Sequence, residues 1–360
     1  MPKIQPQFAF VVHSRDRTDL ARVFPVLKYL PNFLFDLLTL YLPPFTISTI
    51  TGLIDADGNE ILGTLIGIPM TAHQLLERRT QAVDRIAAAV RLAEKQKVSY
   101  IGLGAMTASL SQGGAAVIEH AKKACITTGR TYTVQNICAY VDFCVDRFGM
   151  NKTEVRIAIV GAAGGIGFGV ALELARRGYV RFTLIDVERK LVRLEEQMGD
   201  LHKNQKLELT VHHQLGVLSE CDFVIAATSS PEVVIESKDI RSGTIIINDA
   251  QPSDVSPDIL REREDVLVIE GGVLHTEHIN CHLHMGLVQK NDIFSCLAET
   301  LLLTSTHFTG RRLLHESDPS LQERFREEAK RLHFSLSPQN MLGAIDEKKL
   351  EHFSHIRGKR

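Results

Sequence analysis

The stretch VRIAIVGAAGGIGFGVALELARRGYVRFTLID, from Val155 to Asp186, decides the fold of this 360-residue chain. An apolar run, Ile157–Val160, stops at glycines, and a helical pattern of apolar residues then extends from Ile166 to Leu174. A second predicted strand, Arg181–Ile185, is followed by Asp186. This order predicts a strand, a turn, a helix and a second strand.

The glycines of the turn predict a diphosphate-binding loop. Gly161, Gly164 and Gly167 are three residues apart, in a GxxGxxG rather than a GxGxxG pattern. Glycines let the chain turn tightly, bring backbone N–H groups to a diphosphate and let the helix pack closely on the strand. Asp186 stands where a dinucleotide-binding unit places its acceptor for the adenosine ribose hydroxyls. We therefore expect a dinucleotide cofactor here.

The same alternation continues after Asp186 and predicts a sheet of about six strands. With helices between its strands, the expected fold class is α/β, a doubly wound parallel (Rossmann-type) sheet with right-handed crossovers. Small residues follow the predicted strands, at the edge where such a sheet meets its ligand. The predicted cofactor-binding residues are Gly161, Gly164, Gly165, Ile166, Gly167, Asp186, Arg189, Thr228, Ser229, Gly271 and Gly272.

The first part of the chain also alternates, which predicts a second α/β domain. We expect a substrate domain at residues 1–150, a dinucleotide-binding domain at 151–290, and a helical segment at 291–360 that packs across the cleft. The predicted elements of the first domain are strands at Phe8–His13, Thr46–Ala56, Glu60–Ile68 and Val98–Leu103, and one long helix at Thr71–Lys95.

Composition narrows the partners and the compartment. The chain is 44% hydrophobic and 23% charged, as expected for a protein with sizeable cores. A net charge of -2 without a long basic block argues against a nucleic-acid partner. Six cysteines without a CxxC pair are typical of a reducing compartment. The first apolar run is too short for a signal peptide, so we expect a cytoplasmic protein.

The segment Pro25–Phe45, PVLKYLPNFLFDLLTLYLPPF, is unusually rich in Leu, Phe and Tyr. Lys28, Asp36 and the prolines prevent an uninterrupted bilayer span. Two interpretations remain: a hydrophobic loop and helix buried in the first domain, or a surface that touches lipid or a lipid-like chain. The second interpretation includes a peripheral membrane contact through residues 25–45.

Two further segments carry candidate chemistry. A cluster of histidines between His275 and His284 fits no standard zinc spacing, so we expect a polar loop over the site, no metal, and a proton-handling role for one histidine at most. The pattern at Asn291–Thr304 predicts a helix that begins near Asp292, with Cys296 about one turn in. The positive end of that helix favours a thiolate, although a core cysteine is the alternative.

The segment ITTGRTYT, Ile126–Thr133, precedes a predicted helix at Val134–Arg147. Its hydroxyls and backbone N–H groups can hold a carbonyl or anionic oxygen at the start of the helix. An ordinary helix N-cap explains the same residues, and the residues alone do not separate the two interpretations.

Several of these segments together resemble the acyl-carrier-protein reductases that convert long-chain acyl thioesters to fatty aldehydes. The glycine motif is common to many dehydrogenases, whereas the TTG segment and the last-helix cysteine are more specific. The resembling segments are IGLGAMTASL (Ile101–Leu110), ITTGRTYTVQNIC (Ile126–Cys138), IAIVGAAGGIG (Ile157–Gly167), VIEGGVLH (Val268–His275) and IFSCLAETLLL (Ile293–Leu303).

The resemblance implies a reductase that forms a cysteine acyl-enzyme. In that family the last-helix cysteine, matched by Cys296, takes the acyl group from acyl carrier protein or coenzyme A, and a nicotinamide then delivers hydride. Thr127, Thr128 and Gly129 would hold the developing oxyanion. The chain departs from the family at Arg130 and Tyr132, where Asn and His are common.

The cofactor is expected to be NADPH or NADH. The family generally uses NADPH, but the carboxylate of Asp186 would repel a 2′-phosphate, while Arg189 and Lys190 stand close behind it. Two rival functions are kept: another Rossmann dehydrogenase of the shikimate or glutamyl-tRNA reductase type, and a nucleotide-binding sensor without catalysis.

Overall fold

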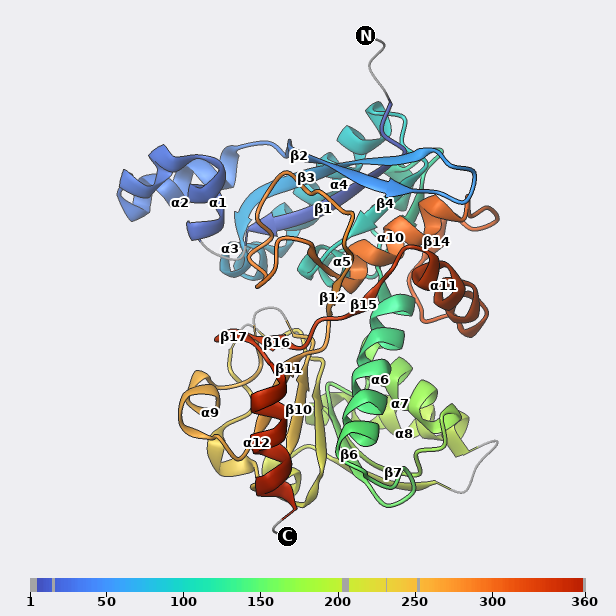
Figure 1. The fold of residues 1–360 in the computed structure, drawn as a ribbon. Coiled ribbons are helices and arrows are strands. Elements are labelled where there is room, and N and C mark those ends of the chain that lie inside the picture. The colour runs from blue at the N-terminus through green and yellow to red at the C-terminus, as the bar shows by residue number, and fades with distance from the viewer. Residues whose placement is uncertain (1–4, 15–16, 203–206, 231, 251–252, 359–360) are drawn as a thin grey trace. The chain divides into compact units, whose positions relative to one another are not determined.

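The protein, a computed structural model described over residues 5–14, 17–202, 207–230, 232–250 and 253–358, divides into two compact units. Unit 1 comprises Met1–Tyr132 and His275–Ser335, and unit 2 comprises Thr133–Leu274 and Leu336–Arg360. Each unit contains a six-stranded, largely parallel sheet (Figure 1). The expected α/β class with Rossmann-type sheets is confirmed.

The sheet of unit 1 is parallel except at one edge, where β2 runs antiparallel to β3. A short strand from late in the chain, β14, joins the other edge beside β5. In order across the sheet the strands are β14 (Leu313–Leu314), β5 (Cys125–Thr127), β4 (Tyr100–Leu103), β1 (Phe8–Ser14), β3 (Glu60–Thr71) and β2 (Phe45–Ile54).

The helices of unit 1 depart from the sequence prediction at one place. The predicted helix at Thr71–Lys95 is two helices, because the backbone at Arg78 leaves helical geometry (φ −120°, ψ 56°). The helices are α1 (Arg17–Val23), η1 (Pro25–Tyr29), α2 (Asn32–Tyr41), α3 (Ala72–Glu77), α4 (Arg79–Lys95), α5 (Met106–Leu110), η2 (Ile118–His120), α10 (Ser295–Ser305) and α11 (Pro319–Arg331).

The sheet of unit 2 has the strand order of a doubly wound dinucleotide-binding fold. Counted from its first strand β6, the chain adds two strands on one side and then three on the other, and every ladder is parallel. In such a sheet a ligand binds where the order reverses, here between β6 and β9. The strands are β11 (Leu267–Glu270), β10 (Ile245–Asn248), β9 (Phe223–Ala226), β6 (Arg156–Val160), β7 (Arg181–Ile185) and β8 (Glu208–His212).

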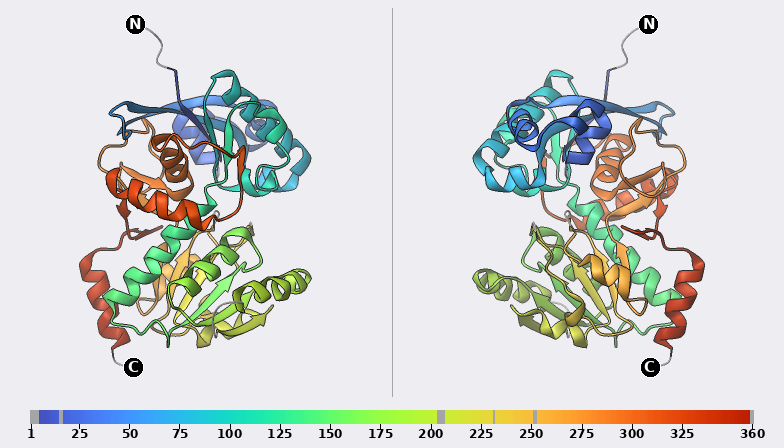
Figure 2. Two further views of the ribbon diagram at one scale, coloured as in Figure 1. Left: turned by 90° about the vertical axis from the view of Figure 1, so that its right-hand side faces the viewer. Right: turned by 90° about the vertical axis from the view of Figure 1, so that its left-hand side faces the viewer.

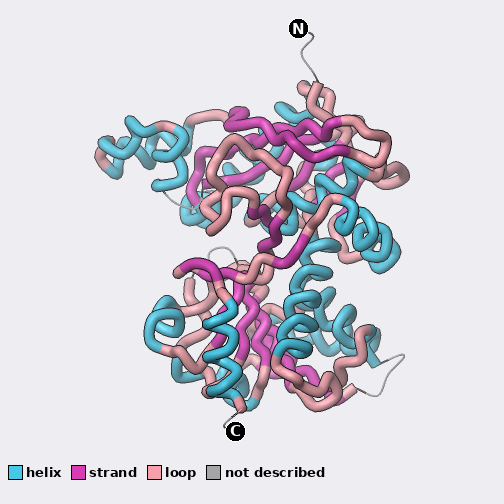
Figure 3. The backbone as a smooth tube through the Cα atoms, viewed as in Figure 1, coloured by secondary structure: helices cyan, strands magenta, loops and turns pink. Residues whose placement is uncertain are grey.

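Both faces of this sheet are covered, which explains why its strands read as continuous apolar runs. Ile157 and Ile159 belong to one core, with residues of α6 and α7, and Ala158 and Val160 belong to a second core on the opposite face. Figures 2 and 3 show helices beside this sheet. The helices are α6 (Arg130–Arg147), α7 (Gly165–Arg176), η3 (Glu188–Lys190), α8 (Leu191–His202), η4 (Leu215–Glu220), η5 (Ser237–Asp239), α9 (Pro257–Glu262) and α12 (Glu347–Arg357).

The division into two compact units differs from the boundaries expected after residues 150 and 290. The chain passes between the units after Tyr132, after Leu274 and after Ser335. The tail is divided, because β14 extends the sheet of unit 1 while Phe353 of α12 packs on Phe148 of unit 2, with ring centroids 5.2 Å apart. Both pairings join residues far apart in the chain and leave no local pattern. The remaining short strands are β12 (Val273–His275), β13 (Asp292–Phe294), β15 (Ser335–Leu336), β16 (Gln339–Asn340) and β17 (Gly343–Ala344).

The predicted start of the last helix near Asp292 is wrong. Asp292–Phe294 forms the strand β13, and α10 begins at Ser295. The carbonyl of Asn291 accepts the N–H of Thr276 at 3.2 Å, so pairing with a distant segment holds this backbone extended. Cys296 is consequently the second residue of the helix, nearer to its N-terminus than the sequence predicted.

Candidate active site

In the glycine loop of unit 2, backbone segments lie so close together that glycines are required. Gly161 follows β6 with φ +87°, and a Cβ there would lie 2.6 Å from the carbonyl oxygen of Ala227. Gly164 is the N-cap of α7, and a Cβ on Gly167 would collide with the carbonyl oxygen of Gly161. A side chain at Gly161 or Gly167 would therefore collide with the backbone, and one at Gly164 would be tight, with its Cβ 3.0 Å from the carbonyl oxygen of Gly161. Its N–H groups at the start of a helix fit a diphosphate.

Asp186 ties this loop to the tip of β7. Its buried carboxylate accepts the N–H of Ala163 at 3.0 Å and that of Val187 at 2.9 Å, and the ammonium of Lys190 lies 3.2 Å away. Arg189 is exposed in the next turn. The ribose contact predicted for Asp186 stays a prediction, and a ribose hydroxyl would have to join the donors already present.

We expect Asp186→Ser to raise the use of NADPH relative to NADH, because removal of the carboxylate removes its repulsion of a 2′-phosphate. Both nucleotides should also bind more weakly, since the N–H of Ala163 loses its acceptor. The measurement is kcat/KM and Kd for each nucleotide. Asp186→Asn is the companion variant, because it removes the charge and keeps an acceptor. An unchanged ratio in both variants would place Asp186 away from the ribose.

The other predicted cofactor residues follow β9 and β11. The N–H and hydroxyl of Thr228 donate to Asp254 at 3.1 and 2.7 Å, and Ser229 follows in the same loop. Gly271 and Gly272 are also tight, because a Cβ on Gly272 would lie 2.6 Å from the Oδ1 atom of Asp249. These residues lie at the carboxyl edge of the sheet, as predicted, while their contacts with a cofactor stay a prediction.

The carboxyl group beside these glycines belongs to Asp249, which directly follows β10. Burial, together with the charges of Glu270 and Asp254, raises the pKa of Asp249 to about 8. Burial also raises the pKa of Glu270 to about 7, although the side chain of Asn248 donates to it at 3.0 Å. Burial and the two neighbouring carboxylates therefore favour the protonated form of Asp249.

In unit 1 the candidate nucleophile meets the TTG turn. Cys296 is half-buried, whereas the other five cysteines are buried. Gly129 has φ +74°, and a Cβ there would collide with the Cα and Cβ atoms of Cys296. The structure thus brings together two features that the sequence marked separately. The thiol lies in the first turn of α10, where the helix dipole favours its thiolate.

The hydroxyls of the TTG turn are engaged in internal hydrogen bonds. Thr127 donates its hydroxyl to Glu299 and accepts the N–H of Gly129 at 3.1 Å. The hydroxyl of Thr128 donates to the carbonyl of Leu314 at 3.3 Å. The oxyanion contacts predicted for Thr127, Thr128 and Gly129 stay predictions, because in this structure these donors already have protein acceptors.

One histidine of the predicted cluster has a distinctive partner. The Nδ1 atom of His275 lies 2.9 Å from the Oδ1 atom of Asp292, a fully buried carboxylate whose other oxygen accepts the N–H of Gln289 at 3.1 Å. A carboxylate at Nδ1 selects the tautomer that leaves Nε2 as an acceptor. His278 instead packs against His333, and His282 bonds with Thr51. His275 is therefore the candidate for handling protons.

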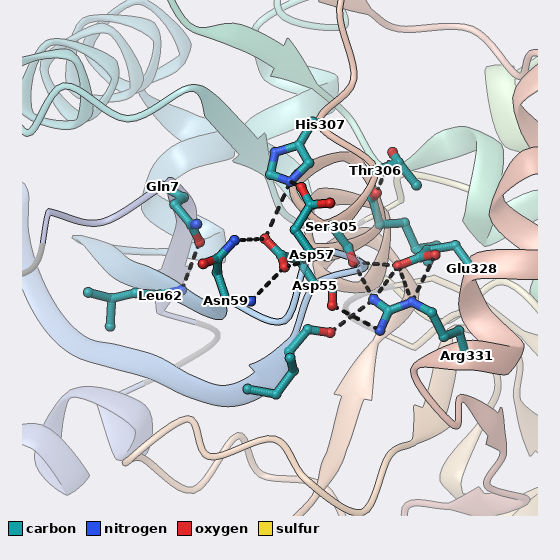
Figure 4. A network of polar contacts seen from close by, with 12 residues as sticks. Gln7, Asp55, Asp57, Asn59, Leu62, Ser305, Thr306, His307, Glu328 and Arg331 are labelled. Atoms are coloured by element: carbon teal, nitrogen blue, oxygen red, sulfur yellow. Dashed lines mark hydrogen bonds and ion pairs between the residues drawn. The ribbon is translucent and has the colours of Figure 1, made fainter.

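A separate polar network closes the turn between β2 and β3 (Figure 4). The ring of His307 lies 3.3 Å from Asp55 and 3.2 Å from Asp57. Although burial opposes it, N–H groups of Asn59 and Asp57 hold the pKa of Asp55 below its usual value. Within the described residues these three side chains could together ligate an ion. The donors of the turn already bind Asp55, so the network is explained by its own contacts.

The apolar segment Pro25–Phe45 forms η1 and α2. It has one buried apolar face and one exposed apolar face. Leu27, Phe35 and Leu40 are buried. The opposite face exposes large apolar side chains: Tyr29 (82%), Phe33 (69%), Leu37 (53%) and Tyr41 (70%). The segment is therefore buried on one side and exposed on the other, and its contact with lipid or a lipid-like chain stays a prediction. No helix in the described part of the chain is long and apolar enough to cross a membrane.

The chain is similar to known dehydrogenases in the region that contains the glycine loop. Residues 144–270 match the family described as shikimate / quinate 5-dehydrogenase. The chain is 28% identical to the long-chain acyl-[acyl-carrier-protein] reductase of Synechococcus elongatus over 276 residues, which cover 72% of this chain and 77% of that protein. It is 24% identical to the aminotransferase PigE of a Serratia species, over 69% of this chain and 29% of that protein.

Among solved structures, L-tryptophan dehydrogenase from Nostoc punctiforme aligns over 98% of this chain and 88% of that one, at a TM-score of 0.44 and 10% identity. The glycine loop and the dehydrogenase match at residues 144–270 together identify the cofactor as NADH or NADPH. The protein is an NAD(P)-dependent oxidoreductase.

Proposed function

We propose that this protein reduces a long-chain fatty acyl thioester to a fatty aldehyde through an acyl-enzyme on Cys296, with NADH or NADPH as reductant. The observation that carries the proposal is the half-buried thiol in the first turn of α10, seated against Gly129. Similarity to a long-chain acyl-[acyl-carrier-protein] reductase over 72% of the chain supports it.

The proposed reaction consists of acyl transfer to Cys296, hydride transfer and release of the aldehyde. The Cys296 thiolate attacks the thioester carbonyl, a new thioester forms, and the carrier leaves as a thiolate that takes up a proton. A nicotinamide, when bound, would supply the hydride that reduces this carbonyl. The resulting hemithioacetal oxyanion collapses, its carbon–sulfur bond breaks, and aldehyde and the Cys296 thiolate are released.

His275 is proposed to take the proton of the Cys296 thiol at its Nε2 atom and then to deliver it to the departing carrier thiolate. Asp292, which holds its Nδ1 atom, lies four residues before Cys296 on one continuous segment, where β13 leads into α10. A ring oriented by a buried carboxylate is suited to general acid–base work.

The direct test uses purified protein with acyl carrier protein or coenzyme A as acyl donor, each with NADH or NADPH. Aldehyde is measured by mass spectrometry after extraction. The proposal predicts aldehyde with at least one of the four combinations. A nucleotide-binding sensor would bind the nicotinamide and form no aldehyde from any donor. A small-substrate dehydrogenase of the shikimate type would also form none, and it leaves the exposed face of α2 without a role.

We further propose that the exposed face of η1 and α2, within residues 25–45, contacts the acyl chain or a membrane surface. Tyrosines at the ends of an apolar face suit the boundary between lipid and water. Acyl carrier protein or acyl-CoA remains the proposed partner that delivers the substrate.

We expect Phe33→Ser and Leu37→Gln to reduce activity with long-chain substrates more than with short-chain ones, because the lost apolar area scales with the chain it contacts. Both side chains are more than half exposed, so the fold should be kept. The measurement is kcat/KM across acyl chain lengths, with flotation on phospholipid vesicles. Val192→Ser, at an exposed valine of α8, is the matched control. Equal losses for all chain lengths, without a change in flotation, would indicate plain packing.

A further inference from the structure

Helix α10 carries a second chemical group one turn after the cysteine. Glu299 is 1% exposed and is surrounded in sequence by apolar residues of the same helix. Residues three apart on a helix share a face, so Glu299 and Cys296 both point toward the segment that carries the TTG turn. Glu299 takes no part in the proposed acyl and hydride transfers.

The two oxygens of Glu299 hold the segment on both sides of Gly129. One oxygen accepts the hydroxyl of Thr127, and the other accepts the N–H of Tyr132 at 2.8 Å. Tyr132 is the third residue of α6, whose first-turn N–H groups have no partner within their own helix. A carboxylate from another helix therefore acts as the cap of α6.

This cap also fixes the turn itself. Because Thr127 gives its proton to Glu299, its oxygen remains an acceptor for the N–H of Gly129, at 3.1 Å. Gly129 in turn lies directly against Cys296, where even one added carbon would collide with the cysteine backbone. A chain of contacts thus links the carboxylate, the turn and the nucleophile.

Opposing effects act on the pKa of the Glu299 carboxyl group. Burial raises the pKa of its carboxyl to about 7, while Thr127, the N–H groups of Tyr132 and Thr131, and the charge of Arg130 act in the opposite direction. The thiol of Cys125 also faces it, and burial together with Glu299 raises the pKa of that thiol to about 12. Cys125 therefore stays neutral while Glu299 titrates.

We propose that Glu299 is the positioning residue of the cysteine site: its carboxylate locks the Thr127–Gly129 turn and the start of α6 against α10, and so sets the place of the Cys296 thiol. The inference deepens the proposed acyl-enzyme function and rests on it. The ionised carboxylate accepts all of its donors, whereas the protonated form carries a hydrogen that competes with the hydroxyl of Thr127.

The test compares Glu299→Gln with the wild type in two reactions of Cys296. Acyl-enzyme formation from acyl donor without nicotinamide should slow by about 10- to 100-fold, with KM for the donor and Kd for the nucleotide kept. Alkylation by iodoacetamide, followed by mass spectrometry at Cys296, should slow as well. If the wild type forms no acyl-enzyme but the variant still alkylates slowly, the proposed function fails and the positioning role stands.

Three further measurements separate positioning from general destabilisation. Glu328→Gln, which removes another carboxylate bonded to a hydroxyl of α10, should leave both reactions unchanged. Thr127→Val should slow both reactions, and the double variant should be no slower than Glu299→Gln, because both residues act through one contact. Below about pH 7 the difference between wild type and Glu299→Gln should narrow, since wild-type Glu299 is then protonated too.

Two results would overturn the proposal. One is a folded Glu299→Gln variant whose thiol reacts with acyl donor and with iodoacetamide at wild-type rates. The other is a double variant whose losses multiply, because independent losses would mean that Glu299 and Thr127 do not act on Cys296 through a common contact.

Discussion

Replacing Cys296 with alanine is expected to remove aldehyde formation, by on the order of 10³-fold or more, while nicotinamide binding stays intact. Without the thiol no covalent thioester can form, and the acyl group leaves with its bulky carrier instead of being held for hydride transfer. The diphosphate is predicted to bind at the glycine loop, which this substitution does not alter. Aldehyde is measured by mass spectrometry and nucleotide affinity by calorimetry.

The acyl-enzyme can also be detected directly. Wild-type protein given acyl donor without reduced nicotinamide should gain the mass of one acyl group at Cys296. Cys281→Ala is the control, since Cys281 is a buried cysteine of the same unit and should neither carry the acyl group nor change the rate. An alanine variant at position 296 that makes aldehyde at the wild-type rate would establish direct hydride transfer to the free thioester and return Cys296 to a packing role.

The second large effect is expected for Gly164→Val, which should weaken nucleotide binding by on the order of 100-fold. Gly164 is the N-cap of α7, and its Cβ would already lie 3.0 Å from the carbonyl oxygen of Gly161. The valine branches would then occupy the space in front of the helix N-terminus, where the N–H groups and the helix dipole attract a diphosphate. Calorimetry with NADH and NADPH measures the loss.

Gly216→Val is the matched control for that experiment, because Gly216 lies in the same unit and a Cβ there meets nothing within 4 Å. Its affinity for either nucleotide should equal that of the wild type. A folded Gly164→Val protein with unchanged affinity would remove the diphosphate from this loop and with it the whole cofactor assignment.

Local sequence patterns correctly predicted those strands and helices that do not depend on pairing with distant segments. The apolar runs at Ile157–Val160 and Arg181–Ile185 form β6 and β7, and the helix between them begins at Gly165, beside the glycines. The parallel direction of these strands was also predicted, from the alternation of strands and helices along the chain. The patterns failed at Arg78 and at Asp292, where one helix became two and a helix start became a strand. At Asp292, pairing with a distant segment outweighed the local preference.

The sequence by itself therefore determined the dinucleotide-binding sheet and its glycine loop, and it marked Cys296 and the TTG turn as separate features. Only the tertiary structure placed Cys296 against Gly129 and revealed Glu299, whose contact with Tyr132 spans 167 residues. The one sequence signal for Glu299 was a lone carboxylate in an apolar helix. Periodicity reports which face of an element is buried, whereas the partner that a buried carboxylate meets is decided by how distant segments pack.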